Sequence, residues 1–182
     1  EETRNINPEE IRKKITDKTK AILYVDYAGQ PCEIDKIKKI AEDHNLFLIE
    51  DACHAIGAEH GGKKVGTFAD MTILSFHPVK HITTGEGGAV LTNDGQLKRK
   101  LMSLRTHGIT NDPEEFVYKE NAFEQKGSNP QESLRNRWYY EQQDLGYNYR
   151  ITDIQCTLGI SQLKKIDQFR QRRRQIVNEY NV

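Results

Sequence analysis

The sequence is poor in cysteine and has no long apolar run. Its three cysteines, Cys32, Cys53 and Cys156, are scattered and form no CxxC pair. An odd, scattered set of thiols is typical of a protein from a reducing compartment and not of a disulfide-bonded secreted domain. No stretch approaches the roughly 20 apolar residues of a membrane-spanning helix, and residues 1–4 do not resemble a signal peptide. We therefore expect a cytoplasmic protein with no membrane partner.

An excess of charge of one sign is also missing. Lysine plus arginine number 27, and aspartate plus glutamate also number 27. Such a balance gives no support to a nucleic-acid partner or to binding at a charged membrane surface. One basic run is local, and we interpret it as the solvated face of a helix; it comprises Arg170, Arg172, Arg173 and Arg174. With 36% hydrophobic residues, the composition is that of a globular domain with a core.

Apolar runs and amphipathic stretches alternate along the first half of the chain. A short helix is expected over 8–15, because Asn7 and Pro8 provide a helix cap and first turn. Continuous apolar runs predict buried strands over 20–27, 46–49 and 71–74. The first two strands flank an amphipathic stretch, 33–44, with isoleucines on one face. Strand, helix and strand in this order predict an α/β fold with a mostly parallel sheet.

The second half is less regular. Gly61 and Gly62 predict a hairpin turn, and a helix is expected from residue 95 to about 105. Residues 110–143 are polar with few apolar anchors, and we expect a long mobile loop there. Residues 144–182 are expected to form a helical segment, because apolar residues recur at helical spacing from Thr152 onwards.

The stretch from Ser75 to Gly88 contains the most unusual lysine of the chain. Lys80 follows a buried strand. A lysine at such a place costs free energy unless it has an ionic partner or a functional role. One such role is condensation with an aldehyde to form a Schiff base. The alternative at this point is a surface loop with a stray lysine.

Two further polar residues follow the predicted strands. Asp51 and Ser75 lie beyond the carboxyl ends of neighbouring strands, where α/β sheets place functional groups. Pyridoxal phosphate needs a carboxylate against its ring nitrogen and hydrogen-bond donors for its phosphate. Asp51, Ser75 and Lys80 could supply these groups, and His54 could reach the ring hydroxyl. Asp51 could instead be a helix cap, and His54 an ordinary polar residue.

A metal site is not expected. His77 and His81 are four residues apart, which is the spacing of a metal pair on a helix. Pro78 lies between them and argues against a helix at this place.

Three sequence blocks together identify a family. They are EDACHAIGA (50–58), GTFADMTILSFHPVKHITTGEGGAVLTND (66–94) and LGYNYRITDIQCTLGISQLKKID (145–167). They resemble the DegT/DnrJ/EryC1/StrS sugar aminotransferases, which are fold type I pyridoxal-phosphate enzymes. The resemblance implies a three-layer αβα large domain, with residues 1–109 as part of the cofactor-binding domain. It also implies a chain truncated at both ends, with 144–182 leading towards a C-terminal small domain.

The resemblance also implies roles for particular residues. Lys80 matches the Schiff-base lysine, Asp51 the partner of the ring nitrogen, and His54 the residue near the ring hydroxyl. Ser75 matches a ligand of the cofactor phosphate. Asn148 matches an asparagine that reaches the phosphate of the cofactor bound by the other subunit, which implies a homodimer with a shared active site.

Within the family, the chain is most similar to the branch that acts on UDP-4-keto-6-deoxy-N-acetylhexosamines in pseudaminic acid biosynthesis. The usual amino donor of that branch is glutamate. By the same resemblance, Lys80 argues against the dehydratase relatives, which have histidine at this position. Two alternatives stay open: an aminotransferase for another keto-sugar nucleotide, and an inactive fragment that only folds or pairs.

Overall fold

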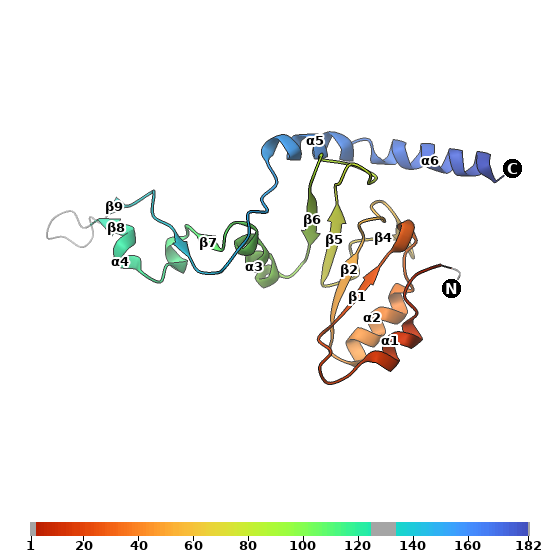
Figure 1. The fold of residues 1–182 in the computed structure, drawn as a ribbon, viewed down its shortest axis with the longest axis horizontal. Coiled ribbons are helices and arrows are strands. Elements are labelled where there is room, and N and C mark those ends of the chain that lie inside the picture. Colours follow the sequence, from red (N-terminus) through yellow and green to blue (C-terminus); the bar gives the residue numbers. More distant parts are fainter. Residues whose placement is uncertain (1–2, 125–133, 182) are drawn as a thin grey trace. The chain divides into compact units, whose positions relative to one another are not determined.

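The computed structural model describes residues 3–124 and 134–181, and the chain divides into two compact units. The first unit comprises Glu1–Asp94 and Ile151–Val182, and the second comprises Gly95–Arg150. Within the described ranges, no helix is both long enough and apolar enough to cross a bilayer. Each unit is described by itself below (Figure 1).

The first unit is built around a four-stranded sheet in the order β1-β2-β5-β6. β1, β2 and β5 pair in parallel, and β6 is antiparallel to β5. The sheet strands are β1 (Ala21–Val25), β2 (Phe47–Asp51), β5 (Met71–Ser75) and β6 (Gly88–Leu91). The other elements of the unit are α1 (Pro8–Lys14), η1 (Tyr27–Gly29), α2 (Ile34–Asp43), the hairpin of β3 (Glu59–His60) and β4 (Lys63–Lys64), α5 (Asp153–Leu163) and α6 (Ile166–Tyr180).

Local sequence accounts for most of these elements. The Asn7 side chain caps α1 by accepting from the Glu9 amide at 2.9 Å. α2 buries Ile34, Ile37 and Ile40 completely, as its helical spacing predicts. These helices and the inward residues of β1 and β2 form one core cluster. The helices predicted over 8–15 and 33–44, the three parallel strands and the hairpin are thus confirmed, and so is the α/β class with a mainly parallel sheet. The segment predicted as helical over 144–182 is helical only from Asp153 onwards.

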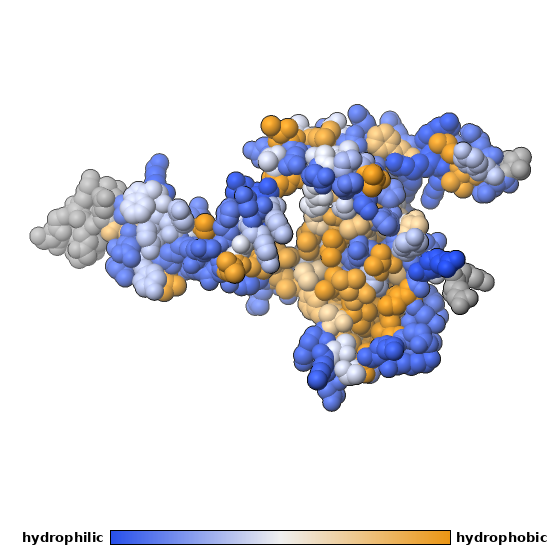
Figure 2. Space-filling model, viewed as in Figure 1, coloured by the Kyte–Doolittle hydropathy of each residue, from blue (hydrophilic) through white to orange (hydrophobic). Residues whose placement is uncertain are grey.

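The register of the sheet decides which side chains enter this core. Tyr24, Glu50 and Thr72 are partners across β1, β2 and β5, and each is at most 1% exposed. Because side chains alternate along a strand, the next position of each strand faces the opposite side. Asp51 therefore lies on the face opposite to the α1–α2 layer. Leu23 on that face is 52% exposed, and apolar residues gather over the strands in Figure 2.

A polar cluster lies inside the core. Glu50 Oε2 accepts from the Thr72 hydroxyl at 2.7 Å and from the Gly66 amide at 2.9 Å. Asp26 Oδ1 accepts from the Cys32 amide at 2.9 Å. Burial, together with the Glu50 charge, raises the pKa of Asp26 to about 6, although the bond from Cys32 opposes this. Burial, followed by the charge of Asp26, raises the pKa of Cys32 to about 12.

A buried carboxylate, Glu141, organises part of the second unit. Its elements are α3 (Gly95–Arg105), β7 (Ile109–Thr110), η2 (Pro113–Glu115), α4 (Lys119–Ala122), β8 (Phe123–Glu124), β9 (Leu134–Arg135) and β10 (Glu141–Gln142). β10 pairs with β7. The Glu141 carboxylate accepts from the amides of Val117 and Tyr118 at 2.7 and 2.8 Å, and from the Tyr139 hydroxyl at 2.9 Å.

The expected long loop over 110–143 thus contains short helices and strands, from β7 to β10. Part of that range, 125–133, lies outside the described residues. Its mobility, and the division at 109 and 143, stay predictions.

Replacing Asp26 tests the buried carboxyl. Because its pKa is raised in the folded protein, Asp26 contributes stability below its ordinary pKa, and this stability is lost as the pH rises to about 6. Asp26→Asn keeps an oxygen for the Cys32 amide and removes the ionisation. We expect the variant to lose this pH dependence and to gain about 1–2 kcal/mol at neutral pH. Urea unfolding followed by circular dichroism between pH 4 and pH 7.5 measures both effects.

The matched control is Asp17→Asn, which removes an exposed carboxylate from the same unit. We expect it to follow the wild-type profile. If Asp26→Asn also follows the wild-type profile, folding does not raise the pKa of Asp26.

Candidate active site

The first candidate residue, Asp51, is the last residue of β2. Its Oδ1 accepts from the Cys53 amide at 3.0 Å, which fixes the carboxylate at the strand end. Burial, assisted by Asp51, raises the pKa of the Cys53 thiol to about 11, whereas the Lys80 charge lowers it. The thiol therefore experiences the charges of both Asp51 and Lys80. Because β2 and β5 are parallel neighbours, Asp51 at the end of β2 and Lys80 in the turn after β5 lie at the same edge of the sheet.

Ser75 and Lys80 come from the end of β5 and the turn that follows it. Ser75 is paired with Gly88 of β6, and a Cβ on Gly88 would lie 2.7 Å from the Leu74 carbonyl oxygen. Only glycine allows this close pairing. The Ser75 hydroxyl accepts from the His77 amide at 3.4 Å, and the Lys80 amide donates to the His77 carbonyl at 2.9 Å. The backbone of Lys80 is therefore held in a turn.

The Lys80 side chain lines a pocket of about 290 Å³ in the first unit. The pocket is lined by Ala28, His54, Val79, Lys80, His81 and Arg173. None of these residues is a carboxylate, and Lys80 is half-buried. Among the ion pairs between described residues, none includes Lys80 or Asp51. Burying an ammonium group without an anionic partner costs free energy. The Lys80 amine is therefore suited to bind an anionic ligand or to react in its neutral form.

The loop after β1 positions His54. Ala28 and Gly29 both have positive φ, 53° and 86°. A Cβ on Gly29 would lie 2.8 Å from the His54 carbonyl oxygen. The Tyr27 ring meets the His54 imidazole edge to face, with ring centroids 6.2 Å apart. The loop therefore packs directly on the segment that follows Asp51.

Four of the five residues predicted for the site belong to the first unit, and one does not. Asp51, Ser75 and Lys80 come from the carboxyl ends of neighbouring strands or the turn after them, and His54 lines the lysine pocket. Asn148 belongs to the second unit, where it is exposed and forms a β-bridge with Thr106. Its role towards a partner subunit stays a prediction.

Sequence reasoning missed two residues of the pocket, His81 and Arg173. The interpretation of the basic run as a solvated face fits Arg172, Arg173 and Arg174, which are exposed, but is wrong for Arg170, which is half-buried and bonded to the Gly57 carbonyl. The helical spacing of Arg170 and Arg173 was the available signal, since residues three apart share a helix face.

The residues present fit pyridoxal phosphate. An unpaired lysine lies in a pocket, a carboxylate lies at the adjacent strand end, and a serine hydroxyl lies at the next strand end. A pyridine nitrogen, an aldehyde and a phosphate are the groups that this donor set suits. The described residues contain no cluster of three or more metal-ligating side chains. Instead, His77 accepts from the Val79 amide at 3.3 Å and lies 3.9 Å from a Glu86 oxygen.

A mainly parallel sheet with reactive side chains beyond its carboxyl ends is the architecture of an α/β enzyme. The chain belongs to the DegT/DnrJ/EryC1/StrS aminotransferase family, whose model matches residues 1–182. This membership confirms the family that the three sequence blocks predict.

Named relatives agree with this family. The chain is 42% identical over 161 residues to the UDP-4-amino-4,6-dideoxy-N-acetyl-beta-L-altrosamine transaminase of Campylobacter jejuni subsp. jejuni serotype O:23/36, covering 88% of this chain and 37% of that protein. Among solved structures, it resembles Helicobacter pylori PseC, an aminotransferase involved in the biosynthesis of pseudoaminic acid. That match has a TM-score of 0.75 and 37% identity, covering 90% of this chain and 38% of PseC.

A second solved structure is the PLP-form of the putative sugar aminotransferase Spr1654 from Streptococcus pneumoniae. It matches with a TM-score of 0.79 and 26% identity, covering 97% of this chain and 44% of that one. In each of the three comparisons, this chain therefore spans less than half the length of its relative.

Gly29→Ala tests the contact between the loop after β1 and His54. Alanine at a φ of 86° is strained, and its Cβ would lie 2.8 Å from the His54 carbonyl oxygen. We expect a loss of stability clearly larger than the about 1–2 kcal/mol of a left-handed residue alone. Chemical unfolding measures the loss, and fluorescence titration with pyridoxal phosphate measures the accompanying damage to the pocket.

Gly62→Ala is the matched control. Gly62 has a φ of 78°, but nothing lies within 4 Å of its added Cβ. This variant is expected to lose only the stability that corresponds to the strained backbone conformation. Its titration with pyridoxal phosphate is expected to be unchanged. Equal losses in both variants would mean that the contact with His54 contributes nothing.

Proposed function

We propose that this chain is part of a pyridoxal-phosphate-dependent aminotransferase that moves an amino group from an amino acid to a keto-sugar nucleotide. One observation supports this most directly. Lys80 is half-buried in a pocket without any carboxylate, in a chain that belongs to an aminotransferase family.

In the proposed site, Asp51 holds the proton on the cofactor ring nitrogen. An opposite charge within about 4–6 Å shifts a pKa by about one to three units, which is enough to keep a pyridine nitrogen protonated near neutral pH. The bound cofactor then supplies an electron sink for the carbon that bears the amino group. The bond from the Cys53 amide to Asp51 Oδ1 holds the carboxylate in place for this role.

The other residues bind the cofactor and move a proton. Lys80 Nζ would hold the cofactor through its aldehyde, and the same nitrogen would serve as the base that moves the substrate proton. The Ser75 hydroxyl would donate to the cofactor phosphate, and His54 would hydrogen-bond the ring hydroxyl. Asn148 of the partner subunit completes the phosphate site, which makes the protein a homodimer with a shared active site.

The proposed acceptor is a UDP-4-keto-6-deoxy-N-acetylhexosamine, and the proposed donor is glutamate. The named relative from Campylobacter jejuni and the likeness to PseC support this choice, which gives the protein a place in pseudaminic acid biosynthesis in the cytoplasm. Another keto-sugar nucleotide is the alternative acceptor. The alternative from a different functional class is an inactive protein that only folds or pairs with a partner. The presence of Lys80, Asp51 and Ser75 together argues against it.

Mapping the cofactor to one lysine tests the proposal. The purified chain is mixed with pyridoxal phosphate, reduced with borohydride and digested, and the labelled lysine is identified by mass spectrometry. In the wild-type protein, we expect the label on Lys80. In Lys80→Ala, we expect no label on the peptide that contains position 80. Asp51→Asn should still be labelled but should bind the cofactor about 10- to 100-fold more weakly, because the ring nitrogen loses its opposite charge.

Lys63→Ala removes an exposed lysine of the β3–β4 hairpin and is the matched control, for which the label on Lys80 is expected to persist. Label spread over surface lysines, with equal amounts in Lys80→Ala, would contradict the proposed site.

A panel of acceptors tests the substrate. The protein is incubated with glutamate and 4-keto sugars attached to UDP, GDP or dTDP, and formation of the amino sugar is followed by mass spectrometry. We expect transfer to the UDP-linked N-acetylhexosamine in preference to the others. Preferred transfer to a GDP- or dTDP-linked sugar would replace this acceptor and leave the proposed chemistry intact.

A further inference from the structure

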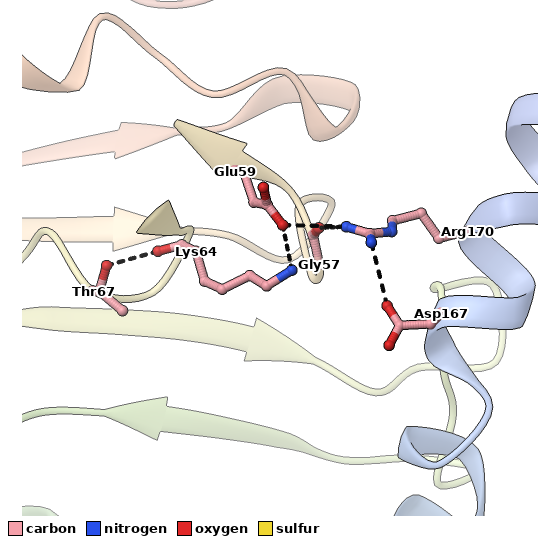
Figure 3. Close-up of polar contacts among 6 residues, drawn as sticks. All are labelled: Gly57, Glu59, Lys64, Thr67, Asp167 and Arg170. Atoms are coloured by element: carbon pink, nitrogen blue, oxygen red, sulfur yellow. Dashed lines mark hydrogen bonds and ion pairs between the residues drawn. The ribbon is translucent and has the colours of Figure 1, made fainter. Parts of the chain in front are cut away.

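α6 is attached to the sheet domain through one arginine, Arg170 (Figure 3). Its Nη1 donates to the Gly57 carbonyl oxygen at 3.1 Å and lies 3.4 Å from Glu59 Oε1. Its Nη2 lies 3.4 Å from Asp167 Oδ1 in the preceding turn. Gly57 also lies under the Ile166 side chain, because a Cβ there would be 3.8 Å from Ile166 Cδ1. These contacts fix the first two turns of α6 on the segment that follows Asp51 and His54.

Arg173 follows Arg170 by three residues and so shares its face of the helix. The Arg173 side chain lines the Lys80 pocket together with His54 and His81. Its Cζ lies 5.9 Å from the centre of the Phe169 ring, which supports the guanidinium from the side of the helix. Among the described residues, Arg173 forms no ion pair. At the open side of the pocket, the exposed Arg173 therefore presents a guanidinium that pairs with no carboxylate in the described part of the first unit.

His81 lies at the same place and has an unused hydrogen-bonding atom. Its Nδ1 is buried and has no hydrogen-bond partner within the described structure. Burial, followed by the charges of Arg173, His54 and Lys80, lowers the pKa of His81. The imidazole lines the same pocket as these three groups, and its buried nitrogen without a partner is an atom that a ligand or a water in the pocket can satisfy. An anion with hydrogen-bonding oxygens satisfies both Arg173 and His81 when the neutral imidazole carries its proton on Nδ1.

The chemistry of the substrates selects among the possible anions. The amino group of an amino-acid donor must come next to Lys80. The α-carboxylate of the donor is attached to the carbon that bears this amino group. That carboxylate must therefore come within a few ångströms of the lysine. In a sugar nucleotide, the diphosphate is on C1, across the ring from the keto carbon C4. A planar guanidinium binds a carboxylate through two parallel hydrogen bonds.

We propose that Arg173 and His81 form the subsite for the α-carboxylate of the amino donor, and that Arg170 positions this subsite by holding α6. This inference rests on the proposed function, since only an aminotransferase has an amino donor. Arg173 contacts the substrate in this arrangement, whereas Arg170 acts through the placement of the helix.

Binding of glutarate tests the subsite without turnover. Glutarate has both carboxylates of glutamate and no amino group, so it can occupy the pocket but cannot react. Its affinity for the chain is measured by calorimetric titration for wild type, Arg173→Gln and Arg173→Lys. We expect Arg173→Gln to weaken binding about 10- to 100-fold, the range of a lost charge-assisted bidentate pair. Arg173→Lys keeps the charge without the fork, and a smaller loss is expected.

Arg174→Gln is the matched control, because it removes the same charge from the next residue of α6, which is exposed like Arg173 but does not line the pocket. It is expected to bind glutarate within about twofold of wild type, since an exposed charge outside the pocket contributes little. Inorganic phosphate is titrated in parallel. Equal losses in Arg173→Gln and Arg174→Gln, no binding of glutarate by wild type, or tighter binding of phosphate than of glutarate would each overturn the carboxylate subsite.

Borohydride labelling of Lys80 in the same proteins separates this inference from the proposed function. Label on Lys80 in all of them, with glutarate binding insensitive to Arg173, means that the subsite is wrong and the function stands. Loss of glutarate binding in Arg173→Gln, without label on Lys80 in wild type, means that the anion site is real and the cofactor assignment fails. Circular dichroism of Arg173→Gln confirms that the variant is folded.

Discussion

The parallel register of β1, β2 and β5 determines which of two adjacent carboxylates enters the core and which faces the site. Glu50 is completely buried, and two donors, the Thr72 hydroxyl and the Gly66 amide, satisfy one of its oxygens. A slip of one residue would separate Glu50 from these donors and bury Asp51 instead. An unsatisfied buried carboxylate is costly. The hydrogen bonds of Glu50 therefore specify the register, and through it the face on which Asp51 lies.

Glycine has a comparable role around the site, at two positions where backbones meet. Gly88 lets β6 pair against Ser75, and Gly29 lets the loop after β1 touch the His54 carbonyl. In both cases, a side chain would push apart two segments that present site residues. The glycines thus set the distances between strand ends, whereas the sheet register sets their directions. Both constraints are local in space but join residues that are distant in the chain.

Much of the sheet domain follows from its sequence. The apolar runs around Ile22, Leu48 and Ile73 predict the three parallel strands, and the isoleucine spacing of α2 predicts its buried face. Asp51 and Ser75 could be assigned to strand ends, because the strands before them were recognised. The sequence blocks then identified the family, which the comparisons confirm.

The rest could not be predicted from the sequence, for identifiable reasons. Arg173 lies at the lysine pocket on a helix that Arg170 attaches to Gly57, and a contact across 113 residues leaves no periodic signal. The same holds for Glu141, which ties together Val117, Tyr118 and Tyr139 by polar bonds. A segment stabilised in this way has no apolar pattern, so its short helices and strands are invisible to a periodicity argument.

The charged groups of the site are held by separate parts of the fold. Asp51 is placed by the register of the sheet, Lys80 by the turn between β5 and β6, and Arg173 by the attachment of α6. In the proposed enzyme, the sheet therefore determines how the cofactor ring is held, whereas α6 determines how the amino donor is recognised. A substitution on α6 can then change the choice of donor without disturbing the electron sink. Such separation is consistent with one family of aminotransferases diversifying its substrates on a constant cofactor domain.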